Sequence, residues 1–317
     1  MKVLGLCFLI YDKINHEELW HNWLRNVDKK KYKIYIHYKN DMKLKYFEKY
    51  KLDNCIETKY CDITIVHAHN ILFRQAYKDG CQKIISLSQA CIPLKSFDYV
   101  YTFLTKDNFS HFNIVPNQKG VFPRCDNIIQ QYGKDNIQKT SNWFILDKKI
   151  AIILCSKKLH EINNVWKSIY CPEEHFFITE VFKNNLTSEI ITTPNVASGA
   201  TTFTNWCNMD YPYQNHYGLK NYNVITTEEI DYLIKQPCLF GRKFNPDCKV
   251  IKNQIPLLNK IPLLNKIPLL NKIPLLNKIP LLNKIPLLNK IPLLNKIPLL
   301  FNEEIEQLSQ YLTKRIC

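Results

Sequence analysis

Two carboxylates and a histidine follow a proline in the segment 171–177 (CPEEHFF). Proline is favoured at the start of a helix, so Pro172 predicts a new helix whose first turn holds Glu173 and Glu174. A carboxylate presented in this way can take a proton from a hydroxyl group, which is the work of a general base. A structural explanation is also open, because acidic residues at a helix start interact favourably with the helix dipole.

A second segment, 239–245 (LFGRKFN), places the cations Arg242 and Lys243 after a glycine and between aromatic residues. Such a loop can hold a diphosphate, although a solvated loop has the same composition. The chain has only 7 glycines and contains neither G-x-G-x-x-G nor a Walker A pattern. A bound nucleotide would therefore be held by side chains rather than by a glycine-rich loop.

Trp143 and Trp206 both follow an asparagine in the segments 140–143 (TSNW) and 203–206 (FTNW). Tryptophan faces stack on sugar rings, but most tryptophans are core residues, so each one alone is a weak indication.

Metal-binding patterns are absent from the sequence. No D-x-D triplet occurs, and Glu229 and Asp231, its nearest equivalent, fall within a predicted helix. The 12 cysteines include no C-x-x-C pair, which leaves a zinc ribbon or a thioredoxin motif without support. Cysteines such as Cys7 and Cys155 lie within apolar runs and resemble small core residues, so we expect a reducing compartment.

The formal charge of +15 includes seven lysines of a C-terminal repeat, and the rest of the chain carries +8. Biased codon usage explains such a charge as well as a basic surface for an anionic partner does, whether a sugar nucleotide, a nucleic acid or an anionic membrane. We expect no nucleic-acid partner.

Strand-like and helix-like segments alternate along the chain, which predicts an α/β fold with a largely parallel central sheet. The predicted strands are 3–11, 33–38, 83–88, 143–146 and 223–226. The predicted helices are 16–26, 63–77, 97–104, 149–157, 160–170, 227–235 and 301–314. Ligands of such sheets bind at the carboxyl ends of the strands, which points to His37 and to the segment 86–93.

Seven complete copies of IPLLNK fill residues 255–296, and a partial copy follows at 297–300. A proline in every sixth position excludes a continuous α-helix. Disorder, a polyproline-like helix and a short solenoid stay open. We expect three parts: a main domain over 1–250, the repeat over 251–300 and a helix within 301–317. The apolar start, 3–11, is too short to span a bilayer and lacks a cleavage site, so we expect a soluble, cytoplasmic protein without a transmembrane segment.

Five segments in this order resemble the core-2/I-branching β-1,6-N-acetylglucosaminyltransferases and their xylosyltransferase relatives. They are 9–12 (LIYD), 34–37 (IYIH), 87–95 (LSQACIPLK), 141–144 (SNWF) and 172–175 (PEEH). Two departures stand out, because Lys39 and Cys91 occupy positions where the family usually has aspartate.

The resemblance implies a nucleotide-sugar fold of the GT-A type and an inverting, metal-independent transfer from a UDP-sugar, GlcNAc or xylose, to a glycan or glycoprotein. It maps the catalytic base onto Glu174, with His175 as a possible orienting residue. The diphosphate ligands map onto Lys243, with Arg242 beside it, and onto Lys220, where the family has arginine.

The resemblance also maps an acceptor contact onto Trp206; Trp143 and Arg124 are further acceptor candidates. No cofactor or metal is expected besides the donor. Two alternatives stay open: a non-catalytic carbohydrate- or nucleotide-binding protein that keeps the fold, and an interaction protein based on the repeat.

Overall fold

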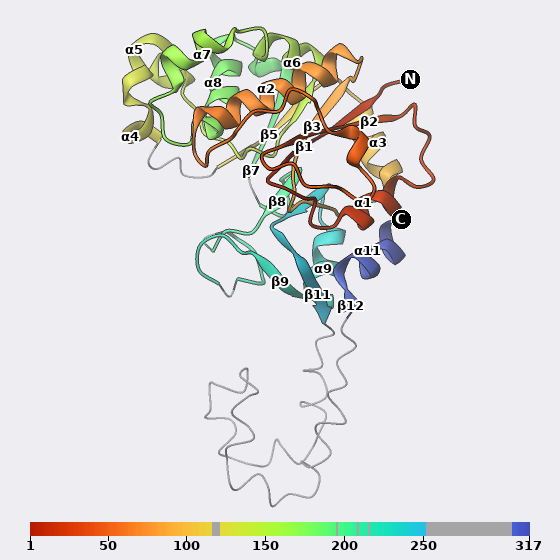
Figure 1. Cartoon of the computed structure of the whole chain (residues 1–317). Helices are drawn as coiled ribbons and strands as arrows, with labels where there is room; N and C mark the ends of the chain where they lie inside the picture. The colour runs from red at the N-terminus through yellow and green to blue at the C-terminus, as the bar shows by residue number, and fades with distance from the viewer. Residues whose placement is uncertain (116–120, 195, 208, 215, 252–305) are drawn as a thin grey trace, which may run out of the picture.

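The computed structural model describes residues 1–115, 121–194, 196–207, 209–214, 216–251 and 306–317 (Figure 1). The repeat 255–300 and the first part of the predicted helix 301–314 lie outside these residues. The strands are β1 Leu4–Ile10, β2 Tyr32–Tyr38, β3 Lys83–Ser88, β4 Ile92–Pro93, β5 Ser110–Ile114, β6 Ile145–Asp147, β7 Ile190–Pro194, β8 Thr202–Thr204, β9 Tyr222–Thr226, β10 Phe240–Arg242, β11 Phe244–Ile251 and β12 Glu306–Gln307.

The α-helices are α1 Glu17–Leu24, α2 Ile63–Lys78, α3 Phe97–Thr105, α4 Val121–Cys125, α5 Ile129–Tyr132, α6 Lys148–Leu154, α7 Leu159–Trp166, α8 Phe176–Lys183, α9 Thr227–Lys235 and α11 Leu308–Ile316. Short 3₁₀ turns are η1 Glu48–Tyr50, η2 Asp126–Ile128, η3 Lys134–Asn136, η4 Pro172–Glu174 and η5 Thr187–Glu189.

The central sheet has the strand order β2-β1-β3-β6-β5-β7. Strand β1 pairs in parallel with both β2 and β3, and β5 pairs in parallel with β7. Strand β6 is antiparallel to both of its neighbours, β3 and β5, so it alone in this sheet runs against the common direction. The predicted α/β class with a largely parallel central sheet is confirmed.

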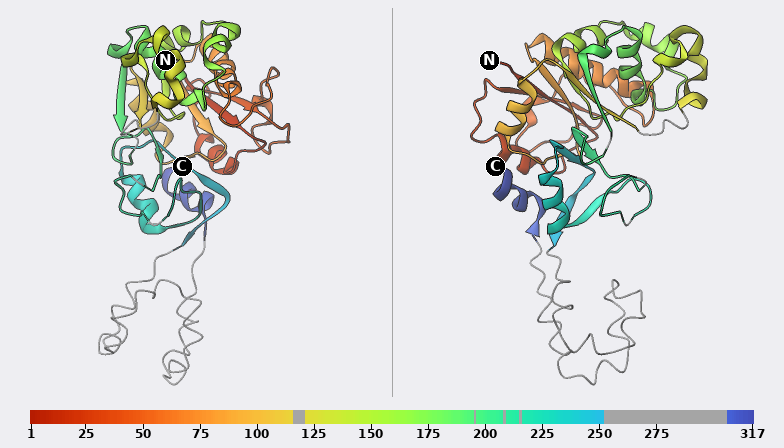
Figure 2. Two further views of the ribbon diagram at one scale, coloured as in Figure 1. Left: turned by 90° about the vertical axis from the view of Figure 1, so that its left-hand side faces the viewer. Right: turned by 180° about the vertical axis from the view of Figure 1, so that it is seen from behind.

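Alternate residues of β1 face opposite sides of the sheet, as strand geometry requires. Leu4, Leu6 and Phe8 belong to one apolar core together with residues of α1, α3, α9 and α11. Cys7 belongs to a second core, with residues of α2, α6, α7 and α8. Figures 1 and 2 show the second group of helices together on one side of the sheet, with α9 and α11 at the opposite end of the molecule.

Besides the central sheet, the described structure has two small sheets, with the strand orders β4-β10-β8 and β12-β11-β9. They are joined in sequence, because β10 ends at Arg242 and β11 begins at Phe244. Helix α11 packs against α1, where Ser309 Oγ lies 3.0 Å from His16 Nδ1. It also contacts α9, because Arg315 Nη1 donates to Asp231 Oδ1 at 2.7 Å. The C-terminal helix therefore completes the core around the N-terminal helix.

The segments predicted from strong apolar periodicity form the expected elements. Helix α9 has the predicted bounds, and β1, β2, β3, α1, α2 and α3 lie within one or two residues of the predicted ones. The strand predicted over 143–146 starts two residues before the observed strand, because β6 begins at Ile145. The helix expected to open at Pro172 is instead the 3₁₀ turn η4, after which α8 begins at Phe176.

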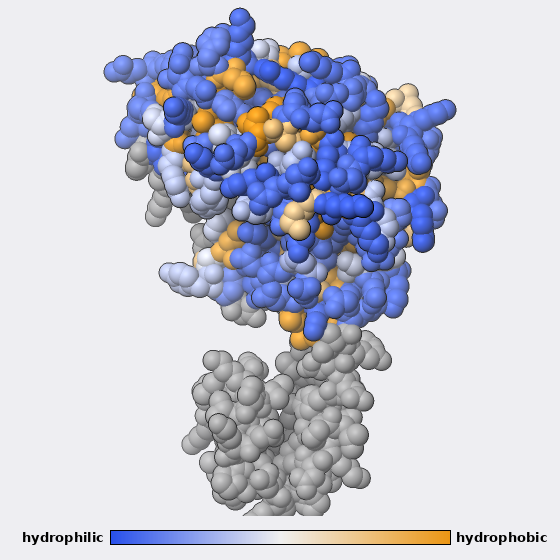
Figure 3. All heavy atoms as spheres, in the orientation of Figure 1, coloured by the Kyte–Doolittle hydropathy of each residue, from blue (hydrophilic) through white to orange (hydrophobic). Residues whose placement is uncertain are grey.

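The face shown in Figure 3 is mostly hydrophilic, with apolar residues in small separate groups. Within the described part of the chain, no helix combines the length and the apolar composition needed to cross a bilayer.

Candidate active site

Glu174 is the last residue of η4, a turn that starts with a proline. Cys171 has a left-handed backbone conformation, φ 52°, and Pro172 fixes the next φ, so the chain reverses sharply into the turn. The Glu174 N–H donates to the Cys171 carbonyl at 3.1 Å, and the Glu174 carbonyl accepts from Thr140 N at 2.9 Å. The turn thus holds Glu174 by its backbone from both sides.

The Glu174 carboxylate has two cationic partners. Arg124 Nη1 donates to its Oε2 at 2.9 Å, and Lys139 Nζ lies 3.4 Å from the same oxygen. The Arg124 guanidinium also lies over the Tyr170 ring, 5.1 Å from its centroid. Charge-assisted bonds of this kind fix the orientation of a carboxylate. Arg124, a predicted acceptor ligand, is therefore placed beside the predicted base.

The two neighbours of Glu174 are buried. Glu173 is 6% exposed, its Oε2 has no hydrogen-bond partner in the described structure, and burial together with the nearby Glu174 charge raises its pKa to about 7. His175 is fully buried, and burial lowers its pKa to about 4. Its Nδ1 bonds the Gln138 carbonyl at 3.0 Å rather than Glu174. The histidine thus anchors the turn to the segment that precedes Thr140.

Two of the predicted diphosphate ligands, Arg242 and Lys243, lie on and just after β10. This strand pairs in parallel with β8, which puts Arg242 opposite Thr204. The Arg242 guanidinium stacks on the Trp143 ring at 4.1 Å from its centroid, and its Nε has no partner in the described structure. Burial lowers the pKa of this guanidinium, whereas the nearby Cys91 opposes the shift. Two predicted site residues, Arg242 and Trp143, are thereby brought into contact.

A backbone hydrogen bond links Lys243 to the segment that follows Lys220. The Tyr222 N–H donates to the Lys243 carbonyl at 2.8 Å, and Lys220 N donates to the Asn205 carbonyl at 2.9 Å. Burial lowers the pKa of Lys243, and the neighbouring Arg242 charge lowers it further. Lys220 Nζ lies over the Tyr222 ring, 5.7 Å from its centroid. The segment 220–222 is thereby held beside Lys243 through its backbone.

Trp206 and Lys220 stand at the base of one loop, closed by the bridge between Trp206 and Leu219. The Trp206 side chain is 41% exposed, which leaves its ring face open to a ligand. Gln214 Nε2 donates to the Trp206 carbonyl and to Asn205 Oδ1, both at 2.9 Å. The side-chain hydrogen bonds of Gln214 therefore hold the base of the loop.

A buried acid holds this loop to α9. Tyr222 Oη donates to Glu229 Oε1 at 2.8 Å, and Tyr211 Oη donates to the same oxygen at 3.1 Å. Asn205 Nδ2 in turn donates to Tyr222 Oη at 2.7 Å. Burial raises the pKa of Glu229, and the Tyr222 and Tyr211 hydroxyls and the charge of Lys220 oppose the shift. Glu229 thus anchors the loop that carries Trp206 and Lys220.

The segment 140–143 connects the two ends of the site, because Thr140 binds Glu174 and Trp143 stacks on Arg242. Asn113, fully buried on β5, holds this segment in place. Its carbonyl accepts from Ser141 N at 3.0 Å, and its Nδ2 donates to the Trp143 carbonyl at 3.4 Å and to the Thr202 carbonyl at 3.2 Å. The central sheet and β8 are thereby tied together behind the site.

The segment 86–93 lies close to the cations, as predicted: β4 pairs with β10, and Phe244 N donates to the Ala90 carbonyl at 3.0 Å. His37 is fully buried, and its Nε2 accepts from Ile56 N at 3.0 Å. That bond gives His37 a packing role at the end of β2.

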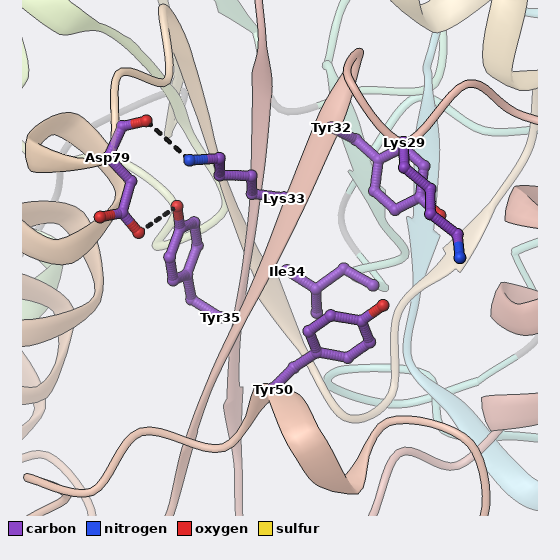
Figure 4. Close-up of a pocket in the computed structure, with 7 residues that line it drawn as sticks. All are labelled: Lys29, Tyr32, Lys33, Ile34, Tyr35, Tyr50 and Asp79. Atoms are coloured by element: carbon purple, nitrogen blue, oxygen red, sulfur yellow. Dashed lines mark hydrogen bonds between the residues drawn. The ribbon is translucent and has the colours of Figure 1, made fainter.

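A cavity of about 330 Å³ lies elsewhere, against the edge strand β2 (Figure 4). Tyr32, Lys33, Ile34 and Tyr35 line it, and Asp79 closes one side by accepting from Tyr35 Oη at 2.9 Å. None of the predicted site residues lines this cavity.

Several residues around the site have no distinguishing signal in the sequence. Lys139 sits beside the predicted segment 140–143, so only its position hints at a role. Asn113 lies in a segment without any motif, and Glu229 stands out only as part of the nearest equivalent of a D-x-D triplet. Cys61 is 110 residues from its disulfide partner Cys171. That disulfide also departs from the expectation of reduced thiols.

Comparison with known proteins identifies the family of the chain. The family model of the Core-2/I-Branching enzymes matches residues 6–234, well over half of the chain. The chain is similar to "Glycosyltransferase BC10" of Oryza sativa subsp. japonica, with 21% identity over 221 residues that cover 59% of this chain. The chain spans 55%, about half, of the length of that relative.

Among solved structures, the chain is similar to the galactosyltransferase LgtC in complex with donor and acceptor sugar analogues, with a TM-score of 0.38 and 9% identity over 74% of this chain and 86% of that one. The LgtC active-site mutant Q189E gives a TM-score of 0.36 and 10% identity over 59% and 72%.

The GT-A-type fold implied by the sequence motifs agrees with the largely parallel central sheet and with the extent of the family match. On that match, the chain belongs to the Core-2/I-Branching enzyme family.

Proposed function

We propose that the protein is an inverting glycosyltransferase that moves a sugar from a UDP-sugar to a hydroxyl group of a glycan or glycoprotein, without a metal ion. One observation carries the proposal: Arg242 and Lys243 lie half-buried next to each other, and no carboxylate of the described structure pairs with either of them. A half-buried pair of cations without an acidic partner suits an anionic ligand such as a diphosphate.

Glu174 supplies the base in this proposal. Its carboxylate takes the proton of the acceptor hydroxyl as that oxygen attacks the anomeric carbon from the face opposite the diphosphate. The bond to the diphosphate breaks, and the UDP leaves with the sugar configuration inverted. Lys243, Arg242 and Lys220 stabilise the charge that develops on the diphosphate, a task that metal-dependent enzymes give to a divalent cation. The absence of a D-x-D triplet from the sequence supports a transfer in which cationic side chains take the place of the metal ion.

Trp206 and Trp143 suit an acceptor sugar, because the face of an indole ring packs well on the apolar face of a pyranose. The Trp206 ring is partly exposed, whereas Trp143 already has one face covered by Arg242. Trp206 is therefore the better placed of the two. The donor sugar proposed is GlcNAc or xylose, on the strength of the family resemblance.

A donor screen tests the proposal. Purified protein is incubated with UDP-GlcNAc, UDP-xylose and other UDP-sugars, with and without a panel of glycan acceptors, in EDTA, and UDP release is measured. We expect acceptor-dependent UDP release with one donor and an unchanged rate when EDTA is replaced by Mn²⁺. Release abolished by EDTA would contradict metal independence. Binding of UDP without turnover of any donor would favour a non-catalytic binding protein.

A further inference from the structure

A disulfide joins Cys61 to Cys171 beside the predicted base. Cys171 directly precedes η4, so it lies three residues before Glu174. Cys61 directly precedes Asp62, the residue whose carboxylate caps α2 by accepting from Thr64 N. The bond therefore connects the start of a long, buried helix to the turn that carries Glu174.

Both cysteines have a left-handed backbone, each with φ 52°, a conformation that residues other than glycine rarely adopt. Cys171 N also donates to the Cys61 carbonyl at 3.2 Å. The covalent bond and this hydrogen bond hold two chain segments in conformations that neither favours alone. Opening the disulfide removes the stronger of these two restraints on the turn.

The surroundings of the two sulfur atoms differ. Cys61 is partly exposed, whereas Cys171 is only 5% exposed. A carboxylate oxygen of the buried Glu173 and the two sulfur atoms all lie within 4.8 Å of one another. Burial raises the pKa of Glu173 to about 7, so a protonated carboxyl group is available at neutral pH next to the buried sulfur. An acid in this place can protonate a departing thiolate.

We propose that Cys61–Cys171 is a redox-active disulfide, opened by dithiol reductants with Glu173 as the proton donor, and that its reduction loosens the turn that positions Glu174. A thiolate of the reductant attacks Cys61 Sγ, the S–S bond breaks, and Cys171 leaves as a thiolate that takes the Glu173 proton. The second thiolate of the reductant then attacks the reductant sulfur that is bonded to Cys61 Sγ in the mixed disulfide. Cys61 is released as a thiolate and protonated by water, and the reductant ends as a cyclic disulfide, so two electrons reach the protein.

The redox part is tested on the full chain by mass spectrometry. Protein equilibrated in mixtures of reduced and oxidised dithiothreitol is alkylated, and the modified cysteines are mapped. We expect Cys61 and Cys171 to pass together from blocked to alkylated across the series. Exposed free thiols such as Cys207 should be alkylated throughout, and a Cys207→Ser control should leave the transition of the pair unchanged. Independent alkylation of both cysteines in fully oxidised protein would overturn the proposal.

The role of Glu173 has its own measurement. In Glu173→Gln, the rate at which dithiothreitol opens the pair should fall by about tenfold or more, because the leaving thiolate loses its proton donor. An unchanged opening rate in this variant would remove Glu173 from the reaction.

The effect on Glu174 rests on the proposed glycosyltransferase function. Reduction should lower kcat by about 10- to 100-fold, the scale expected when a catalytic group loses its position, and leave the KM for the donor unchanged. Reoxidation should restore kcat. The double variant Cys61→Ser/Cys171→Ser should have the low kcat in both buffers. Equal kcat in the oxidised and reduced protein would overturn the positioning role. Absence of turnover in both states would instead contradict the proposed function, while the alkylation result would still decide the redox chemistry.

Discussion

The two ends of the candidate site handle charge in opposite ways. At one end the Glu174 carboxylate already has two partners, Arg124 and Lys139, at 2.9 and 3.4 Å. At the other end Arg242 and Lys243 lie side by side, and no carboxylate of the described structure pairs with either. In the proposed function, the protein itself holds the first end ready, whereas an anionic ligand would complete the second.

The largest expected effect comes from the carboxylate end. Glu174→Gln keeps the size of the side chain but removes the base, so kcat should fall by about 10²–10⁴-fold. Binding of UDP, measured by calorimetry, should not change, because the diphosphate ligands are at the other end. Glu189→Gln, which removes a surface carboxylate paired with Lys149, is the matched control. Near-normal turnover in Glu174→Gln would rule out this residue as the base.

At the cation end, the expected effect is on the binding of UDP. Lys243→Ala removes a charged contact with the diphosphate, and the Kd for UDP should rise by about 10- to 100-fold, since such contacts contribute roughly 1.5–3 kcal/mol. Lys243→Arg keeps the charge and should retain most of the affinity. Lys249→Ala, an exposed lysine on the following strand, serves as the control. If Lys243→Ala binds UDP as tightly as the original protein, the anion site must be placed elsewhere.

A smaller effect concerns how the carboxylate end is built. Burial lowers the pKa of His175 to about 4; Arg124 and Lys139 push it in the same direction, whereas the Gln138 carbonyl and Glu174 oppose the shift. As the pH falls, His175 therefore takes up its proton at a higher pH in the unfolded chain than in the folded protein. The stability that His175 contributes is complete above about pH 6.5 and is lost as the pH falls towards 4. For an ideal two-state shift the loss is about 2 kcal/mol at pH 5.

Urea unfolding at pH 7 and pH 5 measures this loss. His175→Gln should lose less stability between the two pH values than the original protein does, by up to that amount. The exposed His160→Gln variant should behave like the original. An identical pH dependence in His175→Gln would show that this histidine is not held neutral by the fold.

The central elements could be predicted because their apolar residues have a clear period. β1, β3 and α2 bury continuous or helical apolar stripes, and the sequence shows both patterns directly. Strand β5 is not predicted, because its segment SHFNI is mostly polar and its buried Asn113 is satisfied by backbone groups and threonine hydroxyls that lie far away in the sequence. Strand β7 is partly exposed, and its segment IITTP ends in a proline, so it has no apolar period to detect.

The candidate site was predictable only where a residue belongs to a local motif. Glu174, Trp143 and Lys243 each stand in a short, ordered pattern, which is why they could be named. Lys139 and Cys61 act through contacts between segments far apart in the chain, and no local pattern encodes such contacts. The sequence predicts Arg124 as an acceptor ligand, and its contact with Glu174 is visible only in the fold.

The pairing of β11 with β12 has a consequence for the repeat. Lys249 pairs with Gln307 and Val250 with Glu306, so the described residues on either side of the segment 252–305 are neighbours in one antiparallel ladder. Both ends of the intervening segment are fixed by one short hairpin ladder, whatever lies between them. The partners of this ladder all lie outside the repeat, so a gain or loss of six-residue units would leave the pairing residues themselves unchanged.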